Sequence, residues 1–186
     1  MKTNENAGNA PESPVRRQLF GAAAVLVGGL GLGARLRAEG ESEVSHTAEA
    51  IHQEIVFKAS PKKVYDALTV AAEFQKVIDS SAAMQAAAIS NKPAEISREL
   101  GGAFSIFGGH IVGRQLELVP AQRIVQAWRV VDWDPGVFSI AHFELVEQAQ
   151  GTKLAFDHTG FPVGQAAHLA EGWRVNYWQP LARVLA

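Results

Sequence analysis

The feature that most constrains how this chain can fold is a series of short segments in which apolar and polar residues alternate, followed by one segment with the apolar spacing of a helix. Between residues 95 and 159, apolar and polar residues alternate over short stretches separated by turns rich in Gly and Pro, a pattern typical of antiparallel strands. From about residue 164 to 185 the apolar residues recur at spacings of three and four, which predicts an amphipathic helix. A curved antiparallel sheet must cover its apolar face, and this helix is the obvious cover. The order predicts an α+β fold of the helix-grip type, in which a curved antiparallel sheet of about six strands wraps around a long C-terminal helix.

Local signals place the remaining elements. A strand is expected at residues 51–59, and Ser60 followed by Pro61 predicts that a helix begins there, with Ser as the N-cap and Pro in the first helical position. A second short helix is expected at residues 71–78. Further strands are expected at residues 95–100, 103–107, 111–119, 123–133, 137–146 and 152–159.

Glycine and proline positions predict two local features. The Gly108-Gly109 pair suits a two-residue hairpin turn, because such turns need positive φ angles. Pro180 removes the backbone hydrogen bond to the Asn176 carbonyl, so the C-terminal helix should kink or break near its end.

The first 38 residues are expected to be an export signal. Arg16 and Arg17 precede an apolar run, Leu19–Ala34, that is shorter than the roughly 20 residues a membrane helix needs. A basic start, an apolar middle and a small-residue end are the parts of such a signal, and the arginine pair resembles the twin-arginine type. The expectation is a periplasmic protein that meets the membrane only through this signal; the alternative is an uncleaved signal that anchors it there. Residues 39–50 are expected to form an acidic linker, and residues 51–186 the folded domain.

Composition excludes several functions. The formal net charge is −2 and no basic stripe occurs, which argues against a nucleic-acid partner. The absence of cysteine excludes disulfides, thiolate catalysis and Cys-based zinc sites. The six histidines are scattered, without a metal-binding pair on a helix, and no phosphate-binding loop or Ser-His-Asp order is present. We therefore expect neither a metal nor a cofactor.

Three stretches carry a family resemblance: GGAFSIFGGHIVGRQLELVPAQRIVQAWR, GTKLAFDHTGFP and EGWRVNYWQPLARVL. They resemble the bacterial homologues of the C-terminal domain of the activator of the 90-kDa heat-shock protein ATPase, in the SRPBCC (START-like) superfamily, over about residues 51–186. The resemblance implies the helix-grip fold. It implies function less closely, because the superfamily includes lipid carriers, cyclases, hormone receptors and co-chaperones. The eukaryotic co-chaperone carries a separate N-terminal domain that makes much of the chaperone contact, where this chain has the expected export signal.

Strand parity selects candidate pocket residues. On segment 152–159 His158 shares a face with apolar residues, and on segment 111–119 the same parity places Arg114 toward the helix, whereas His142 falls on the solvent side. A buried His could act as a general base, and an Arg could hold a carboxylate. The alternatives are a backbone or water contact for His158 and an ion pair with Glu95 or Glu99 for Arg114. The candidate ligand-binding residues are Phe104, Arg114, Phe143, Phe156, His158, Trp173 and Tyr177.

The leading functional hypothesis is an exported protein that binds a small apolar or amphiphilic molecule between the sheet and the C-terminal helix. If Trp173 and Tyr177 instead interlock fully with the sheet, they belong to a packed core. Two alternatives stay open: a co-chaperone-like module that binds a protein partner, and an enzyme of the cyclase or hydrolase kind that uses His158 and Arg114. We expect that the chain is not an enzyme, because only two polar groups converge on the expected cavity.

Overall fold

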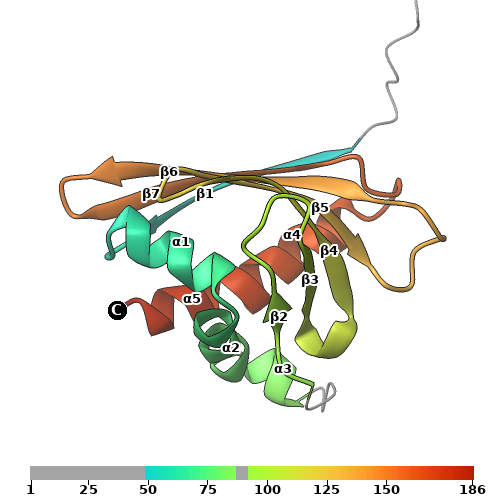
Figure 1. The fold of residues 1–186 in the computed structure, drawn as a ribbon, viewed down its shortest axis with the longest axis horizontal. Helices are drawn as coiled ribbons and strands as arrows, with labels where there is room; N and C mark the ends of the chain where they lie inside the picture. The colour runs from blue at the N-terminus through green and yellow to red at the C-terminus, as the bar shows by residue number, and fades with distance from the viewer. Residues whose placement is uncertain (1–48, 87–91) are drawn as a thin grey trace, which may run out of the picture. The chain divides into compact units, whose positions relative to one another are not determined.

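A curved sheet of seven antiparallel strands forms one layer of the domain, and the helices cover its inner face (Figure 1). This computed structural model describes residues 49–86 and 92–186, so the expected export signal, with Arg16 and Arg17, lies outside the described residues. The strands are β1 (Ala50–Phe57), β2 (Glu95–Ile96), β3 (Ala103–Ile106), β4 (Ile111–Val119), β5 (Arg123–Val130), β6 (Ser139–Gln148) and β7 (Gly151–Thr159). The helical elements are α1 (Pro61–Thr69), α2 (Ala71–Asp79), α3 (Ala82–Ala86), the 3₁₀ turn η1 (Phe107–Gly109), α4 (Ala166–Trp173), the π-helical turn η2 (Arg174–Trp178) and α5 (Gln179–Val184).

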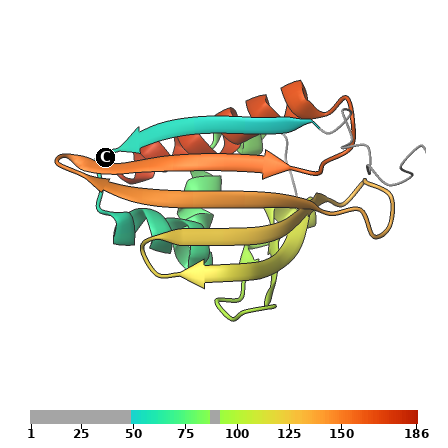
Figure 2. The same cartoon turned by 90° about the horizontal axis from the view of Figure 1, so that it is seen from above.

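The strand order is β1-β7-β6-β5-β4-β3-β2, and every neighbouring pair is antiparallel. Seen from above, the long strands β1, β7, β6, β5 and β4 lie side by side, and the C-terminal helix, in red, lies behind β1 and β7 (Figure 2). The α+β helix-grip prediction is confirmed. The sheet has seven strands rather than about six, because all seven expected strand segments pair into it. The expected strand 95–100 is shortened to the two-residue β2, which pairs with β3.

The helix α1 begins where the sequence predicts. The Ser60 side chain accepts a hydrogen bond from the Lys63 backbone N–H, and Pro61 occupies the start of the helix. These two residues satisfy the first turn of the helix and fix its start. The helix then buries Val64 and Leu68 against the sheet side of the core.

The C-terminal helix is interrupted by a π-helical turn. The segment runs as α4, then η2, then α5, and the Gln179 N–H bonds to the Arg174 carbonyl five residues earlier. Pro180 follows directly, and it has no N–H to give to Asn176. The predicted irregularity near Pro180 is therefore confirmed, and it takes the form of a π turn, a feature frequent at functional sites.

A bulge in β4 reverses the predicted parity of that strand. Gln115 pairs with Gln126 and Glu117 pairs with Val125, so Leu116 is an extra residue in the strand. A bulge shifts which side chains face the core. Leu118 packs on the core from one side of this bulge, whereas Arg114, on the other side, is exposed. The expectation that Arg114 faces the helix is wrong, because it assumed one unbroken alternation.

The β3–β4 connection differs from the expected two-residue hairpin. Ile106 pairs with Ile111, so four residues form the turn, and the His110 N–H bonds to the Phe107 carbonyl. Gly108 has a φ of 66°, a conformation that glycine adopts without strain. The longer turn places the Phe107 ring in the core.

Most large apolar side chains of the described residues share one core between the sheet and the helices. Gly113 makes room for it, because a Cβ atom there would lie 2.3 Å from the Phe104 ring. The Glu49 carboxylate accepts hydrogen bonds from the Gly164 and Ala166 N–H groups and ties the start of α4 to the start of β1. Within residues 49–86 and 92–186, every helix is too short or too polar to cross a membrane.

Candidate functional site: a small cavity beside the C-terminal helix

One side of the C-terminal helix meets a closed hydrogen-bond network around His158. The Trp173 indole N–H donates to His158 Nδ1 at 3.0 Å, and His158 Nε2 lies 2.7 Å from Ser139 Oγ. The Ser139 hydroxyl donates onward to the Trp128 carbonyl at 2.8 Å. Because Nδ1 accepts and Ser139 gives its own proton away, His158 carries its proton on Nε2.

The network holds His158 neutral. Burial lowers the pKa of His158 from its ordinary value of 6.5 to about 4, since no carboxylate lies beside the ring to favour its charged form. Both ring nitrogens are engaged within the protein, so neither is free to take a proton from a ligand. His158 is therefore a structural residue of the core, and its predicted position on the inner face of β7 is correct.

Aromatic rings fill the centre of the interface between sheet and helix. The Trp173 ring lies 4.3 Å from Phe156 and 4.1 Å from Tyr177, measured between centroids, and it stacks on Trp178. Phe143 packs edge-on to Trp173. These rings interlock rather than line a large pocket, and the space left beside Phe104 and Phe143 has a volume of only ≈ 10 Å³.

A larger cavity of ≈ 90 Å³ lies at the end of the helix where the π turn begins. Its walls come from helix α3, the η1 turn, strands β4 and β5, helix α4 and the η2 turn. The exposed residues His110 and His168 mark its mouth, whereas the rings of Phe107, Trp128 and Trp173 are buried. The lining residues are Met84, Phe107, His110, Ile111, Trp128, Val130, His168, Leu169, Gly172, Trp173, Asn176 and Tyr177.

Three buried polar atoms without hydrogen-bond partners belong to residues that line this cavity. They are Trp128 Nε1, Asn176 Oδ1 and the Tyr177 hydroxyl. Only one further atom of this kind occurs among the described residues, Gln115 Nε2, and Gln115 is not part of the cavity wall. Native proteins pair most of their buried polar groups, so three exceptions around one cavity single out this place in the fold.

The Tyr177 hydroxyl lies in a strongly desolvated environment. Burial raises its pKa well above the ordinary value of 10, and the nearby Trp128 N–H opposes this rise. The two groups therefore lie close together, although they form no hydrogen bond of ordinary geometry.

The structure divides the predicted site residues. Trp173 and Tyr177 line the cavity; Phe104 and Phe143 border the smaller space, and Phe156 and His158 are packed in the core. Arg114 lies on the outer face, where its Nη1 donates to the Gly101 carbonyl at 2.9 Å, so its predicted place in the pocket is wrong.

Ten of the twelve lining residues were absent from the prediction, among them Trp128, Asn176 and Gly172. The parity of Trp128 is ambiguous in sequence, because both faces of its strand mix apolar and polar residues. No sequence signal marks Asn176, since its position depends on the π turn. Gly172 lines the cavity, and a Cβ atom added there would meet no atom within 4 Å.

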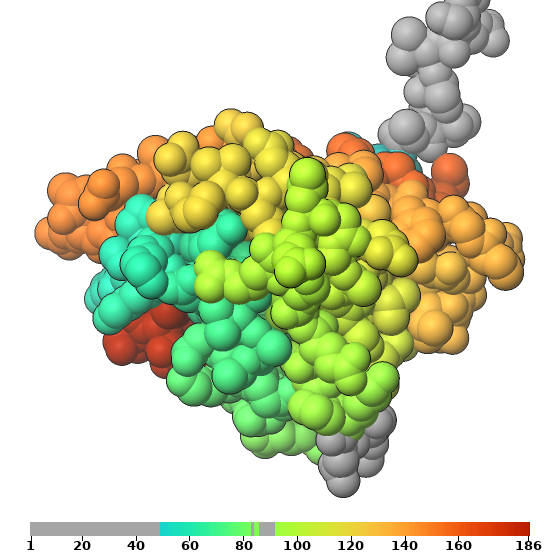
Figure 3. Space-filling model, viewed as in Figure 1, coloured from blue at the N-terminus to red at the C-terminus, as the bar shows by residue number. Residues whose placement is uncertain are grey.

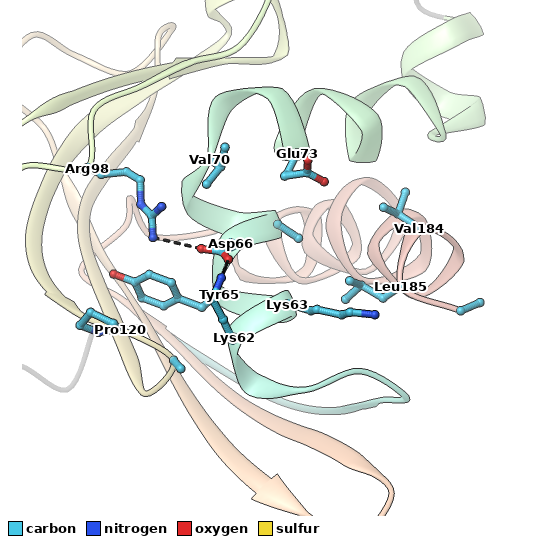
Figure 4. A pocket seen from close by; sticks show the side chains of 13 residues that line it. Lys62, Lys63, Tyr65, Asp66, Val70, Glu73, Arg98, Pro120, Val184 and Leu185 are labelled. Carbon is cyan, nitrogen blue, oxygen red and sulfur yellow. Dashed lines mark hydrogen bonds and ion pairs between the residues drawn. The ribbon is translucent and has the colours of Figure 1, made fainter.

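An open groove of ≈ 790 Å³ lies on the other side of the domain (Figure 4). It runs between α1, the end of α5 and the β4–β5 turn, and the space-filling view shows the C-terminal residues, in red, beside α1 (Figure 3). At its centre Asp66 pairs with both Lys62 and Arg98, and Arg98 lies over the Tyr65 ring at 5.5 Å. The hydrogen bond and charge of Lys62, with Arg98, lower the pKa of Asp66. The charges at the centre of this groove thus already have partners within the protein.

No group of three or more His, Asp or Glu side chains in residues 49–86 and 92–186 is arranged to hold a metal ion. The outer face of the sheet brings His52, Asp157 and His142 into one row across β1, β7 and β6. Within this row the His52 ring bonds to the Asp157 carboxylate at 2.7 Å. His142 lies on the solvent side, as its parity predicts.

The fold defines the class of protein first: a seven-stranded helix-grip domain of the SRPBCC type. The family model described as "Activator of Hsp90 ATPase homolog 1-like protein" matches residues 58–186, and the chain belongs to this family.

Curated relatives carry the corresponding names. The chain is 27% identical over 123 residues to human "Activator of 90 kDa heat shock protein ATPase homolog 1", a match that covers 66% of this chain and 33% of the relative. It is 26% identical over 136 residues to the mouse protein named homolog 2, covering 73% of this chain and 38% of that protein. The chain thus spans about a third of the length of these relatives.

Solved structures share the fold. An HSP90 activator from Plasmodium falciparum aligns with a TM-score of 0.62 at 24% identity, over 75% of this chain and 96% of that chain. CalU16 from Micromonospora echinospora aligns with a TM-score of 0.59 at 18% identity, over 75% of this chain and 77% of that chain. At such identities the likeness concerns the fold alone.

Proposed function

We propose that this domain binds a small apolar or amphiphilic molecule in the ≈ 90 Å³ cavity beside the C-terminal helix. The observation that supports this most is the gathering of Trp128 Nε1, Asn176 Oδ1 and the Tyr177 hydroxyl, all buried and unpartnered, around one cavity. A buried polar group without a partner destabilises the fold by about 1–3 kcal/mol. The residues that carry these atoms form part of the cavity wall, so the wall includes the least well satisfied part of the core.

The walls of the cavity suit such a ligand. Small-molecule sites are lined mainly by apolar and aromatic side chains, with a few polar groups that fix the orientation of the ligand. Here the rings of Phe107, Trp128 and Trp173 provide the apolar part. The cavity is smaller than the few hundred Å³ typical of drug-sized ligands, so the part of the ligand that enters is small, and any longer portion lies toward the mouth.

A cavity-filling variant tests this proposal. Because a Cβ atom added at Gly172 meets no atom within 4 Å and Gly172 lines the cavity, we expect the side chain of Gly172→Leu to occupy the cavity. Glycine is a poor helix former, so the variant should be at least as stable as the wild type. We expect small benzenoid and short-chain probes to change the tryptophan emission of the wild type saturably, and Gly172→Leu to lose this response.

The matched control is Ala167→Leu, on the exposed surface of the same helix and outside the cavity wall. It should bind the probes as the wild type does. If no probe of the panel gives a saturable change with the wild type, or if Gly172→Leu binds unchanged, the cavity is not a ligand site.

A second function, binding of a protein partner, is favoured by the open groove between α1 and the end of α5. The groove combines charged and apolar side chains, and the curated relatives are named as activators of the 90-kDa heat-shock protein ATPase. If the domain acts in this way, it should raise the ATPase rate of a purified 90-kDa heat-shock protein. The paired variant Lys63→Glu and Arg98→Glu should then abolish the effect, whereas Gly172→Leu should leave it unchanged.

The proposed compartment rests on the sequence of residues 1–38. The twin-arginine pattern at Arg16 and Arg17 supports export to the periplasm. Replacing both with Lys should retain the protein in the cytoplasm, because the export receptor reads the paired guanidinium groups. An unchanged periplasmic yield would contradict this route.

The enzyme alternative receives no support from the placement of its residues. His158 lies on the inner face of the sheet with both nitrogens engaged, and Arg114 lies on the outer face. The two groups cannot act on one substrate in this arrangement.

A further inference from the structure

The interior of the cavity offers a ligand few hydrogen bonds. Trp128 Nε1, Asn176 Oδ1 and the Tyr177 hydroxyl belong to wall residues, but these atoms are themselves shielded almost completely from solvent. The Trp173 indole N–H already donates a hydrogen bond within the core. Apolar side chains and one glycine complete the inner wall: Met84, Phe107, Ile111, Val130, Leu169 and Gly172. A ligand inside the cavity is therefore held mainly by contact with apolar and aromatic surface.

The same wall carries no Lys, Arg, Asp or Glu among the described residues that line the cavity. Glu171 and Arg174 are close to the wall residues in sequence, but they pair with each other and do not line the cavity. An ionised group inside the cavity loses its hydration and finds no counterion, which is costly. The end of the ligand that enters is therefore uncharged.

Two imidazoles mark the mouth of the cavity. His110 follows the η1 turn and His168 lies on α4, and both are exposed while lining the cavity. Neither ring has a hydrogen-bond or ion-pair partner within the described part of the chain. An imidazole N–H can donate to a carboxylate in either protonation state of the ring, whereas an ammonium group meets no carboxylate of the wall. Resting on the proposed function, we infer that the cavity takes the uncharged apolar end of a monocarboxylate amphiphile, whose carboxylate stays at the mouth beside His110 and His168.

The volume of the cavity limits how the two ends of this ligand are connected. A cavity of about 150 Å³ holds one benzene molecule, so the ≈ 90 Å³ here leaves space for no more than one small ring or a short branched chain. A carboxylate bonded directly to such a ring is drawn into the apolar interior with it. A spacer of a few methylene groups lets the carboxylate stay at the mouth. The ligand class is therefore an arylalkanoic or short fatty acid rather than an aromatic acid.

Probes that differ in one feature test this inference. Toluene, benzoate, 4-phenylbutyrate and 4-phenylbutylamine are titrated into the ¹⁵N-labelled full chain, and binding is followed through the indole N–H signals of Trp128 and Trp173, which line the cavity. Toluene and 4-phenylbutyrate should bind. Benzoate should bind at least about tenfold more weakly than 4-phenylbutyrate, because its charge has to enter the cavity with the ring. The amine should bind about threefold more weakly than 4-phenylbutyrate, the ratio typical of one exposed contact to a charged group.

The role of the mouth is tested by combining His110→Ala with His168→Ala. Both side chains are exposed, so the double variant should be about as stable as the wild type. It should bind 4-phenylbutyrate and 4-phenylbutylamine with equal affinity and leave the affinity for toluene unchanged. The matched control is His142→Ala, which removes a histidine from the outer face of the sheet and should retain the preference for the acid.

The outcomes separate this inference from the proposed function. If benzoate binds as tightly as 4-phenylbutyrate, or the amine as tightly as the acid, the inferred ligand class is wrong. It is also wrong if the double histidine variant keeps the preference for the acid, because the carboxylate then does not lie beside these residues. In each of these cases, toluene binding that Gly172→Leu abolishes leaves the proposed function intact. If neither these probes nor the wider panel bind, the proposed function itself fails.

Discussion

Two neighbouring regions along the C-terminal helix, one around His158 and one around Tyr177, treat buried polar groups in opposite ways. On the His158 side, each buried nitrogen or hydroxyl finds a partner, from Trp173 through His158 and Ser139 to the Trp128 carbonyl. On the Tyr177 side, a few ångströms along the same helix, three such groups have none. Trp128 takes part in both, since its carbonyl belongs to the closed network and its indole N–H to the cavity.

This difference distinguishes the part of the core that stabilises the fold from the part that is available for binding. A satisfied buried network orders the core, whereas unsatisfied polar groups weaken it unless something else pairs them. The π turn lies next to the second region, and Asn176 and Tyr177 both belong to it. We infer that the His158 side stabilises the fold and that the Tyr177 side is available for binding.

The largest expected effect comes from removing the ring that joins both regions. Trp173 is 2% exposed, packs on Phe156 and Trp178, and supplies the donor to His158. Trp173→Ala should lower the free energy of unfolding by about 3–5 kcal/mol, because it leaves a large cavity and an unpaired His158 nitrogen. Chemical denaturation followed by circular dichroism measures this value. A loss below about 1 kcal/mol would show that the ring is not part of the packed core.

The second effect is a pH dependence that belongs to the closed network. The pKa of His158 is lowered to about 4 in the folded protein, against 6.5 when unfolded. Between these values the unfolded chain binds a proton that the folded chain excludes. Stability should therefore be complete above pH 6.5 and fall as the pH decreases toward 4, by about 3 kcal/mol in total.

The control for this titration is His158→Gln. Its amide can accept from Trp173 and donate to Ser139 but does not titrate, so the other acidic and histidine groups contribute equally to both proteins. The difference in unfolding free energy between wild type and variant should change across this pH range. A constant difference would contradict a buried neutral His158.

A smaller effect is expected on the cavity side. Tyr177→Phe removes a buried hydroxyl that has no partner, so the free energy of unfolding should stay within about 1 kcal/mol of the wild type. A small increase is expected, because the variant no longer buries an unpaired polar group. Thermal unfolding in the absence of ligand measures this. A loss of 2 kcal/mol or more would mean, by the usual strength of buried hydrogen bonds, that the hydroxyl has a structural partner.

A comparison of strands with and without a bulge explains how much of the fold could be predicted from the sequence. Regular alternation correctly placed Phe143, Phe156 and His158 on the inner face, because β6 and β7 pair without a bulge. It failed on β4, where the extra residue Leu116 turns Arg114 outward. A bulge depends on the pairing of two strands, which local alternation does not encode.

The cavity itself could be predicted only in part. Trp173 and Tyr177 follow from helical spacing, whereas the approach of Trp128 to Asn176 depends on the π turn and on the curvature of the sheet. Whether a polar atom is paired is a property of the whole fold, because the partner can come from any element. The chemistry of the cavity therefore becomes visible only in three dimensions.

The smallest expected effect concerns Arg114, the residue that sequence and structure place differently. Its side chain is exposed and bonds only to the Gly101 carbonyl, so Arg114→Ala should change stability by no more than about 0.5 kcal/mol. Its adjacent residue provides the contrast: Gln115 is fully buried and accepts a hydrogen bond from Gln126, so Gln115→Ala should be destabilising by about 1–3 kcal/mol. Binding of the small benzenoid and short-chain probes should be unchanged in Arg114→Ala, because the side chain lies on the opposite face of the sheet from the cavity. Weaker binding of any cavity ligand in this variant would mean that Arg114 reaches the interior, and hence that the β4 bulge does not lie at Leu116.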